Sequence, residues 1–128
     1  MAGDPLRPVL QTLAVVQGLI GLAQTFAPGW FYDTLANFGA RSDHTLRDVA
    51  TYYLASSAAL LISVSRKSWR VPVLLLVLAQ YVLHSLNHLF DIGKADPSWV
   101  GPADAVSLIA IAAGLGWALS IAFKQERP

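Results

Sequence analysis

The chain has 128 residues, of which 55% are apolar and 13% are charged. A soluble domain of this length has too small a core to bury so much apolar surface, so the composition predicts a protein solvated by a lipid bilayer. The formal net charge of +1 argues against a nucleic-acid partner, and the absence of cysteine excludes disulfides, thiolate metal sites and cysteine nucleophiles.

Four apolar segments approach the roughly 20 residues that a helix needs to cross a bilayer. They are residues 9–26, 46–65, 71–90 and 105–123. We therefore expect a single all-α domain over residues 1–128, built as a four-transmembrane-helix bundle.

Lysine and arginine are divided unequally among the connections, and this asymmetry sets the orientation of a multi-pass protein. Six lie near the termini and in the turn at 66–70: Arg7, Arg66, Lys67, Arg70, Lys124 and Arg127. The remaining connections carry Arg41, Arg47 and Lys94, together with most of the acidic residues. Both termini are therefore expected on the cytoplasmic side of the inner membrane.

The first apolar segment carries Gln17, Gly21 and Gln24 on one helical face. Amide side chains inside a bilayer either bond to a neighbouring helix or line a polar cavity, so Gln24 is a candidate ligand-binding residue. The small residues Ala14 and Gly18 permit close helix approach, either within the bundle or across a homodimer seam.

An aromatic-rich connection follows, with Trp30, Phe31, Tyr32, Leu35 and Phe38 between residues 27 and 43. Its pattern predicts a short interfacial helical segment in the headgroup region. We expect it to act as an anchor, with a lid over the outer mouth of the bundle as the alternative.

At the start of the second segment, His44, Asp48 and Tyr52 recur at four-residue steps and would share one helical face. His44 and Asp48 are candidate metal ligands, Asp48 also a candidate catalytic residue, and Arg47 and Tyr52 are candidates for holding a ligand. The alternatives are a capping box formed by Thr45 and Asp48, and an Arg47 that reaches to the headgroups.

The third segment carries a polar stripe within one sector of the helix: Gln80, Tyr81, His84, Asn87, His88 and Asp91. Ionisable side chains in hydrocarbon must be paired, hydrated or liganded, so this stripe is expected to face the bundle interior near the outer leaflet. Histidines at i and i+4 can both bind one metal ion, with Asp91 as a third ligand. The alternative is that His84 bonds to a neighbouring helix and His88 contacts interfacial water.

Before the fourth segment, Asp104 follows Pro102 and is expected to be an ordinary first-turn acid. Later in that segment, the small residues Ala112, Gly116 and Ser120 recur at four-residue spacing. They again permit close packing within the bundle or in a homodimer.

Three features together resemble a family of small four-helix integral membrane proteins of actinobacteria that has no assigned activity. They are the aromatic pair Phe31-Tyr32, the H-x2-R-D motif from His44 to Asp48, and the H-x3-H motif from His84 to His88. The resemblance covers most of the chain and implies a cytoplasmic-membrane protein with these residues as its signature. In size and helix count the chain is also distantly similar to DoxX-like proteins, which is an analogy of fold alone.

Three functions stay open on these residues, and whether the protein is an enzyme is left undecided. The first is a site for a divalent metal, zinc before others, formed by His84, His88, Asp91, His44 and Asp48, with Asn87 and Gln24 beside it and room for a lipophilic substrate. The second is a metal-free acid–base enzyme using His84 or His88 with Asp48, or a haem-binding protein. The third is a non-catalytic accessory or homo-oligomeric subunit whose polar stripe holds helices together.

Overall fold

The computed structural model describes residues 3–126, and its regular structure is helical throughout. The helices are α1 (Leu6–Phe26), α2 (Pro28–Leu35), α3 (Asp43–Ser65), α4 (Arg70–Phe90) and α5 (Val100–Glu126), with a short 3-10 turn, η1 (Lys67–Trp69), before α4. Between residues 3 and 126 there is no strand, and an isolated β-bridge joins Phe38 to Ala95. Arg127, one of the six basic residues from which the orientation is predicted, lies outside the described residues.

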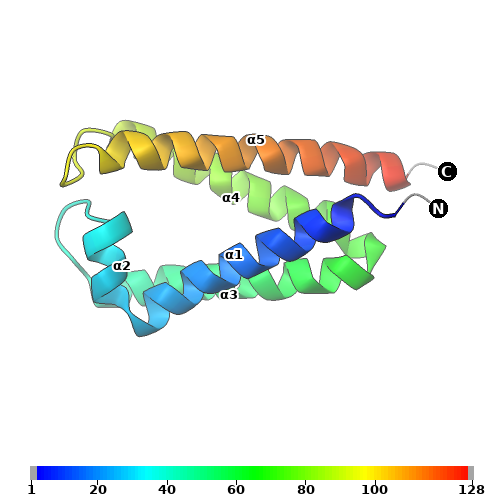
Figure 1. Ribbon diagram of the computed structural model, residues 1–128, viewed down its shortest axis with the longest axis horizontal. Helices are drawn as coiled ribbons and strands as arrows, with labels where there is room; N and C mark the ends of the chain where they lie inside the picture. Colours follow the sequence, from blue (N-terminus) through cyan, green and yellow to red (C-terminus); the bar gives the residue numbers. More distant parts are fainter. Residues whose placement is uncertain (1–2, 127–128) are drawn as a thin grey trace.

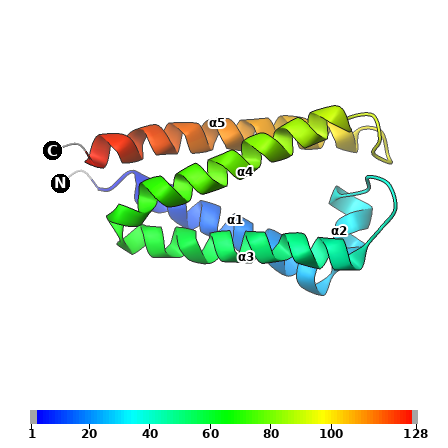
Figure 2. The same cartoon turned by 180° about the vertical axis from the view of Figure 1, so that it is seen from behind.

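The four long helices form an elongated bundle in which α1 packs along α3 and α4 packs along α5 (Figure 1). Both chain ends lie at the same end of the bundle, which we call the termini end. At the opposite end, α2 and the α4–α5 connection lie near each other, and we call this the α2 end (Figure 2).

The predicted helices are confirmed, and three of them end where the sequence places their ends, at Phe26, Ser65 and Phe90. The short helical segment in the aromatic connection is also confirmed, as α2. α3 begins earlier than predicted because Ser42 is its N-cap and accepts a hydrogen bond from the Thr45 backbone N–H at 3.3 Å. The capping box of Thr45 with Asp48 is therefore wrong.

Three helical stretches are long and apolar enough to cross a membrane: Leu6–Phe26, Lys67–Phe90 and Val100–Glu126. They also carry large apolar side chains that are well exposed, such as Leu19, Leu83 and Val106. Exposed apolar surface on this scale requires an apolar solvent, which indicates a membrane protein. α3 is long enough to cross as well, at about 35 Å, but polar residues in its first two turns make it less apolar than the other three.

Small residues of α1 allow its backbone to approach α3 closely. A Cβ atom added at Gly21 would lie 2.8 Å from Leu54 Cγ and 3.2 Å from the backbone oxygen of Ala50. About two turns further back, the Ser57 hydroxyl donates to the backbone oxygen of Ala14 at 2.7 Å. The small residues of α1 therefore serve packing within the bundle, whereas Gly116 of α5 faces open space.

At the termini end, one buried arginine contacts the ends of the other three long helices. Arg70, with a side chain only 3% exposed, forms an ion pair with Asp4 just before α1. Its Nη1 donates to Gln125 Oε1 of α5 at 2.7 Å. Its Nε donates to the backbone oxygen of Ser63 at 3.2 Å, and its Nη2 to that of Val64 at 3.4 Å. Because the last carbonyls of a helix lack intrahelical donors, Arg70 also satisfies the end of α3.

The same contacts change the acidity of Asp4. Hydrogen bonds from Arg70 and from the Gln125 amide lower the pKa of Asp4 from 3.8 to about 2. A carboxyl group whose pKa is depressed by folding contributes stability above its unfolded pKa and loses that contribution as the pH falls. The Asp4–Arg70 pair therefore stabilises the fold fully above about pH 4 and progressively less between pH 4 and 2.

We predict that Arg70→Met destabilises the protein markedly, because the variant leaves Asp4 and the α3 carbonyls without their donor. Removal of one partner from a buried ion pair costs about 3–5 kcal/mol, and we expect a loss near the lower value because Asp4 is partly exposed. The free energy of unfolding, measured by denaturant titration in non-ionic detergent, checks this. Arg66→Met, at an exposed position of the same turn, is the matched control. Equal stability of the two variants would contradict the role of Arg70.

Candidate functional site

A pocket of about 310 Å³ lies at the α2 end, and all five α-helices contribute to its lining. Most of the lining is apolar, and the polar side chains are few. The lining residues are Ile20, Gln24, Phe31, Leu35, Ala36, Phe38, Leu46, Val49, Tyr53, His84, His88, Asp104, Ser107 and Leu108. A small number of polar groups in an apolar pocket is the usual composition of a ligand site.

Two loops and α2 close this end of the bundle. The loop after α2 is held to the α4–α5 connection by the bridge between Phe38 and Ala95 and by the Asp96 N–H, which donates to the Asn37 backbone oxygen at 3.1 Å. Gly39, at φ 74°, turns the chain there, in a conformation that favours glycine. The Phe38 ring then meets the His88 ring edge-on, with centroids 4.8 Å apart. The aromatic connection therefore lines the pocket as well as anchoring to the bundle.

The two histidines of α4 face each other inside this pocket. His88 Nε2 lies 2.9 Å from His84 Nε2, and the ring centroids are 4.8 Å apart. On the far side of each ring, Gln80 Nε2 lies 3.2 Å from His84 Nδ1, and Asp104 Oδ2 lies 3.9 Å from His88 Nδ1. Gln80, His84, His88 and Asp104 thus form a row of polar side chains that runs from α4 to α5.

With both rings neutral and the Gln80 amide nitrogen facing His84, the hydrogens of the row have one consistent arrangement, which ends at the carboxylate. The Gln80 amide N–H donates to His84 Nδ1, which places the hydrogen of a neutral His84 ring on Nε2. That N–H then donates to His88 Nε2, and the hydrogen of a neutral His88 ring sits on Nδ1, facing Asp104. The two rings therefore share a single hydrogen between their Nε2 atoms and adopt different tautomers.

Several buried polar atoms near this row have no hydrogen-bond partner among residues 3–126. They include Gln24 Oε1, Gln80 Oε1 and His88 Nδ1, and further along the core both amide atoms of Gln17. Unpaired polar atoms are costly in an apolar interior and mark places where a ligand or water can bind. Gln24 lines the pocket, and its unpaired buried oxygen places a partial negative charge in that wall.

The structure brings only part of the predicted metal set together. His84 and His88 are in contact, but His44 and Asp48 pair with each other at 3.4 Å, and their side chains are 88% and 67% exposed. Asp91 follows the end of α4 and pairs with Lys94 at 2.7 Å. Within residues 3–126, no group of three or more His, Asp or Glu side chains is placed to hold a metal ion.

The other predicted ligand-binding residues also lie outside the pocket, apart from Gln24. Arg47 Nε donates to the backbone oxygen of Thr25 at 3.4 Å, which ties α3 to the end of α1. The Tyr52 ring packs edge-on against Tyr53, with its hydroxyl buried and unpaired. Asn87 is exposed on the outer face of α4.

Asp104 was missed as a site residue because it was interpreted as a first-turn acid. α5 begins at Val100, so Asp104 lies a full turn inside the helix and lines the pocket together with Ser107 and Leu108. Residues at i, i+3 and i+4 share a helical face. The spacing of Asp104, Ser107 and Leu108 in the sequence could therefore have indicated that the three side chains face the same pocket.

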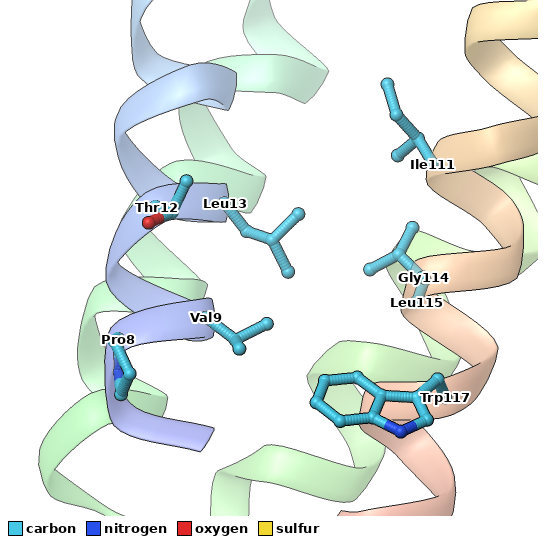
Figure 3. A pocket seen from close by; sticks show the side chains of 8 residues that line it. All are labelled: Pro8, Val9, Thr12, Leu13, Ile111, Gly114, Leu115 and Trp117. Atoms are coloured by element: carbon cyan, nitrogen blue, oxygen red, sulfur yellow. The ribbon is translucent and has the colours of Figure 1, made fainter. Parts of the chain in front are cut away.

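A second pocket, of about 400 Å³, lies between α1 and α5 towards the termini end (Figure 3). Leu13 of α1 and Leu115 of α5 point toward each other across it. Its remaining lining is apolar apart from Thr12, and it contains no ionisable side chain. The groups capable of acid–base or ionic chemistry therefore belong to the pocket at the α2 end.

No protein-family model, curated protein or solved structure matches the chain. The case for a function therefore rests on the geometry of the pocket.

We predict that His84 and His88 occupy different neutral tautomers, with hydrogen on Nε2 of His84 and on Nδ1 of His88. Long-range ¹H–¹⁵N correlation spectra of ¹⁵N-histidine-labelled protein at pH 8 distinguish the two forms. His84→Gln and His88→Gln assign the signals, and exposed His44 serves as the internal reference. Identical tautomers in the two rings would contradict the shared hydrogen.

Proposed function

We propose that the chain is a four-helix integral membrane protein that binds a small amphipathic ligand in the pocket at the α2 end. The observation that carries this proposal is the division of the pocket lining. Apolar side chains such as Ile20 and Leu108 form most of the walls, while His84, His88 and Asp104 lie together at one side. An apolar tail and a polar head match these two parts.

The fourth crossing in this proposal is α3. Its packing along α1 supports it, because a helix held by one that crosses the bilayer runs at the same depth. Its charged residues lie only in the first turns, at the α2 end, where they reach the headgroups. With lysine and arginine enriched at the termini end, both termini lie in the cytoplasm and the pocket lies in the outer leaflet of the inner membrane.

This topology gives a first prediction, and the lack of cysteine makes it easy to test. Ser98 lies in the α4–α5 connection and Ser68 in the η1 turn, and both are exposed. In intact cells, a membrane-impermeant maleimide should label the Ser98→Cys variant and spare the Ser68→Cys variant. Permeabilised cells, in which both are labelled, provide the control. The reverse pattern, or labelling of both in intact cells, would overturn the orientation.

The second prediction concerns the pocket itself. A long-chain alcohol carrying a photoactivatable diazirine should cross-link to pocket peptides, and Leu108→Trp should reduce that labelling several-fold because the larger ring fills the cavity. Leu76→Trp is the matched control, since Leu76 is exposed on α4. Mass spectrometry of the cross-linked peptides is the measurement, with Val49→Phe as a second blocking variant. Labelling spread evenly over exposed helical faces would leave the polar row as a helix–helix contact and contradict ligand binding.

A divalent metal is the second candidate occupant, favoured by the 2.9 Å separation of the two histidine Nε2 atoms. Two nitrogens on a tetrahedral zinc ion are roughly 3.3 Å apart when each bond is about 2.0 Å, so a small widening would suffice. Asp104 would then accept the hydrogen on His88 Nδ1, and the Gln80 amide, turned so that its oxygen faces His84 Nδ1, would accept the hydrogen there, as outer partners of metal-binding histidines do. The remaining ligands would have to come from water or the bound molecule. Elemental analysis of purified protein, compared with His84→Gln, tests this candidate.

A further inference from the structure

The polar side of the α2-end pocket supplies hydrogen-bond acceptors and a carboxylate that lack a positive partner. We propose that the pocket selects a lipophilic cation, an amine or quaternary ammonium whose positive head lies beside Asp104. This inference rests on the proposed function and names the chemical class of its ligand.

The first observation is the isolation of the Asp104 carboxylate. Among residues 3–126 it receives no hydrogen bond, and its nearest potential cation is His88 Nδ1 at 3.9 Å. No lysine or arginine lines the pocket. A carboxylate in an apolar environment is costly unless a positive group or strong donors accompany it. The Asp104 side chain is 25% exposed, so a cationic head in the pocket can reach it.

The second observation is a free acceptor on α1. Gln24 is 4% exposed, lines the same pocket, and its Oε1 is buried without a hydrogen-bond partner. An ammonium N–H, or the polarised methyl groups of a quaternary ammonium, can approach such an oxygen, whereas an anionic head would be repelled by it. Gln24 and Asp104 therefore favour the same sign of ligand charge.

The third observation is the aromatic lining. Phe31, Phe38 and Tyr53 belong to three successive segments of the chain and all line the pocket. The faces of aromatic rings attract cations, and quaternary ammonium groups are bound in this way. With apolar walls for the tail, the pocket contains each element that recognition of a lipophilic cation requires.

The available donors argue against an anionic ligand. Without lysine or arginine, the available donors are neutral groups: the histidine rings, the Tyr53 and Ser107 hydroxyls and the Gln24 amide. One of the ring hydrogens is already used between the two Nε2 atoms. The His88 Nδ1 hydrogen faces Asp104, which would repel an anionic head at that position. The row of polar side chains therefore ends at the pocket in an acceptor, the Asp104 carboxylate, and carries no cationic donor of Lys or Arg type.

The experiment is a competition in nanodiscs of zwitterionic phosphatidylcholine, with cross-linking of the diazirine alcohol in the pocket as the readout. Decyltrimethylammonium, 1-decanol and decyl sulfate have the same chain length and differ in the charge of the head. We expect the cation to displace the probe at a concentration about tenfold lower than the alcohol requires, with the sulfate weakest. In Asp104→Asn, the advantage of the cation should disappear, while displacement by the alcohol should stay unchanged.

Asp91→Asn is the matched control, because Asp91 pairs with Lys94 and does not line the pocket. Gln24→Leu, checked for an unchanged melting temperature, is the second variant and should weaken the cation selectively. If alcohol and sulfate compete as well as the cation, or Asp104→Asn retains the advantage, the inference is wrong while the pocket stands as a ligand site. If no compound displaces the probe and labelling is diffuse, the proposed function itself fails.

Discussion

The architecture depends on one buried guanidinium at the termini end. Arg70 of α4 joins Asp4 before α1, the last carbonyls of α3 and Gln125 of α5, so the four long helices are fixed relative to one another at that end. Arginine suits this role because its donors spread in a plane and serve several acceptors at once. The pocket that contains ionisable side chains lies at the other end of the bundle, away from these contacts.

The two ends of the bundle differ in how completely their buried polar atoms are hydrogen-bonded. Among the described residues, no buried side-chain polar atom at the termini end lacks a hydrogen-bond partner, whereas towards the α2 end Gln24 Oε1, Gln80 Oε1 and His88 Nδ1 lack one. Unsatisfied atoms of this kind weaken a fold that uses them only as helix contacts. Two of these atoms, Gln24 Oε1 and His88 Nδ1, belong to residues that line the pocket, where the proposed function places a bound molecule.

Much of the helical framework was predictable from the sequence, because length and continuous apolarity determine membrane-crossing helices almost locally. The inward position of His84 and His88 also followed, since ionisable groups avoid hydrocarbon. The sequence-based predictions were wrong where the exact end of a helix, or its rotation about its own axis, decides what a side chain contacts. α3 begins at Asp43, so His44 and Asp48 lie at an exposed helix end, and α4 ends before Asp91, which breaks the assumed helical spacing.

Arg70 and Asp104 show why the remainder could not be predicted. Arg70 is one of several basic residues near a turn, and its burial depends on contacts with Asp4 and Gln125, which are distant in sequence. Asp104 contributes to the pocket through the rotation of α5 about its axis, which the nearly uniform apolar character of that helix does not reveal. Local patterns show which residues share a face, but the packing partners decide where that face points.

The layer of leucines beneath the pocket determines which routes an occupant can take. Leu10, Leu60, Leu74 and Leu115, one from each long helix, are fully buried between the His84–His88 pair and Arg70. These leucines separate the pocket at the α2 end from the Arg70 contacts at the termini end. Under the proposed function, an occupant would therefore enter and leave at the α2 end or sideways between helices.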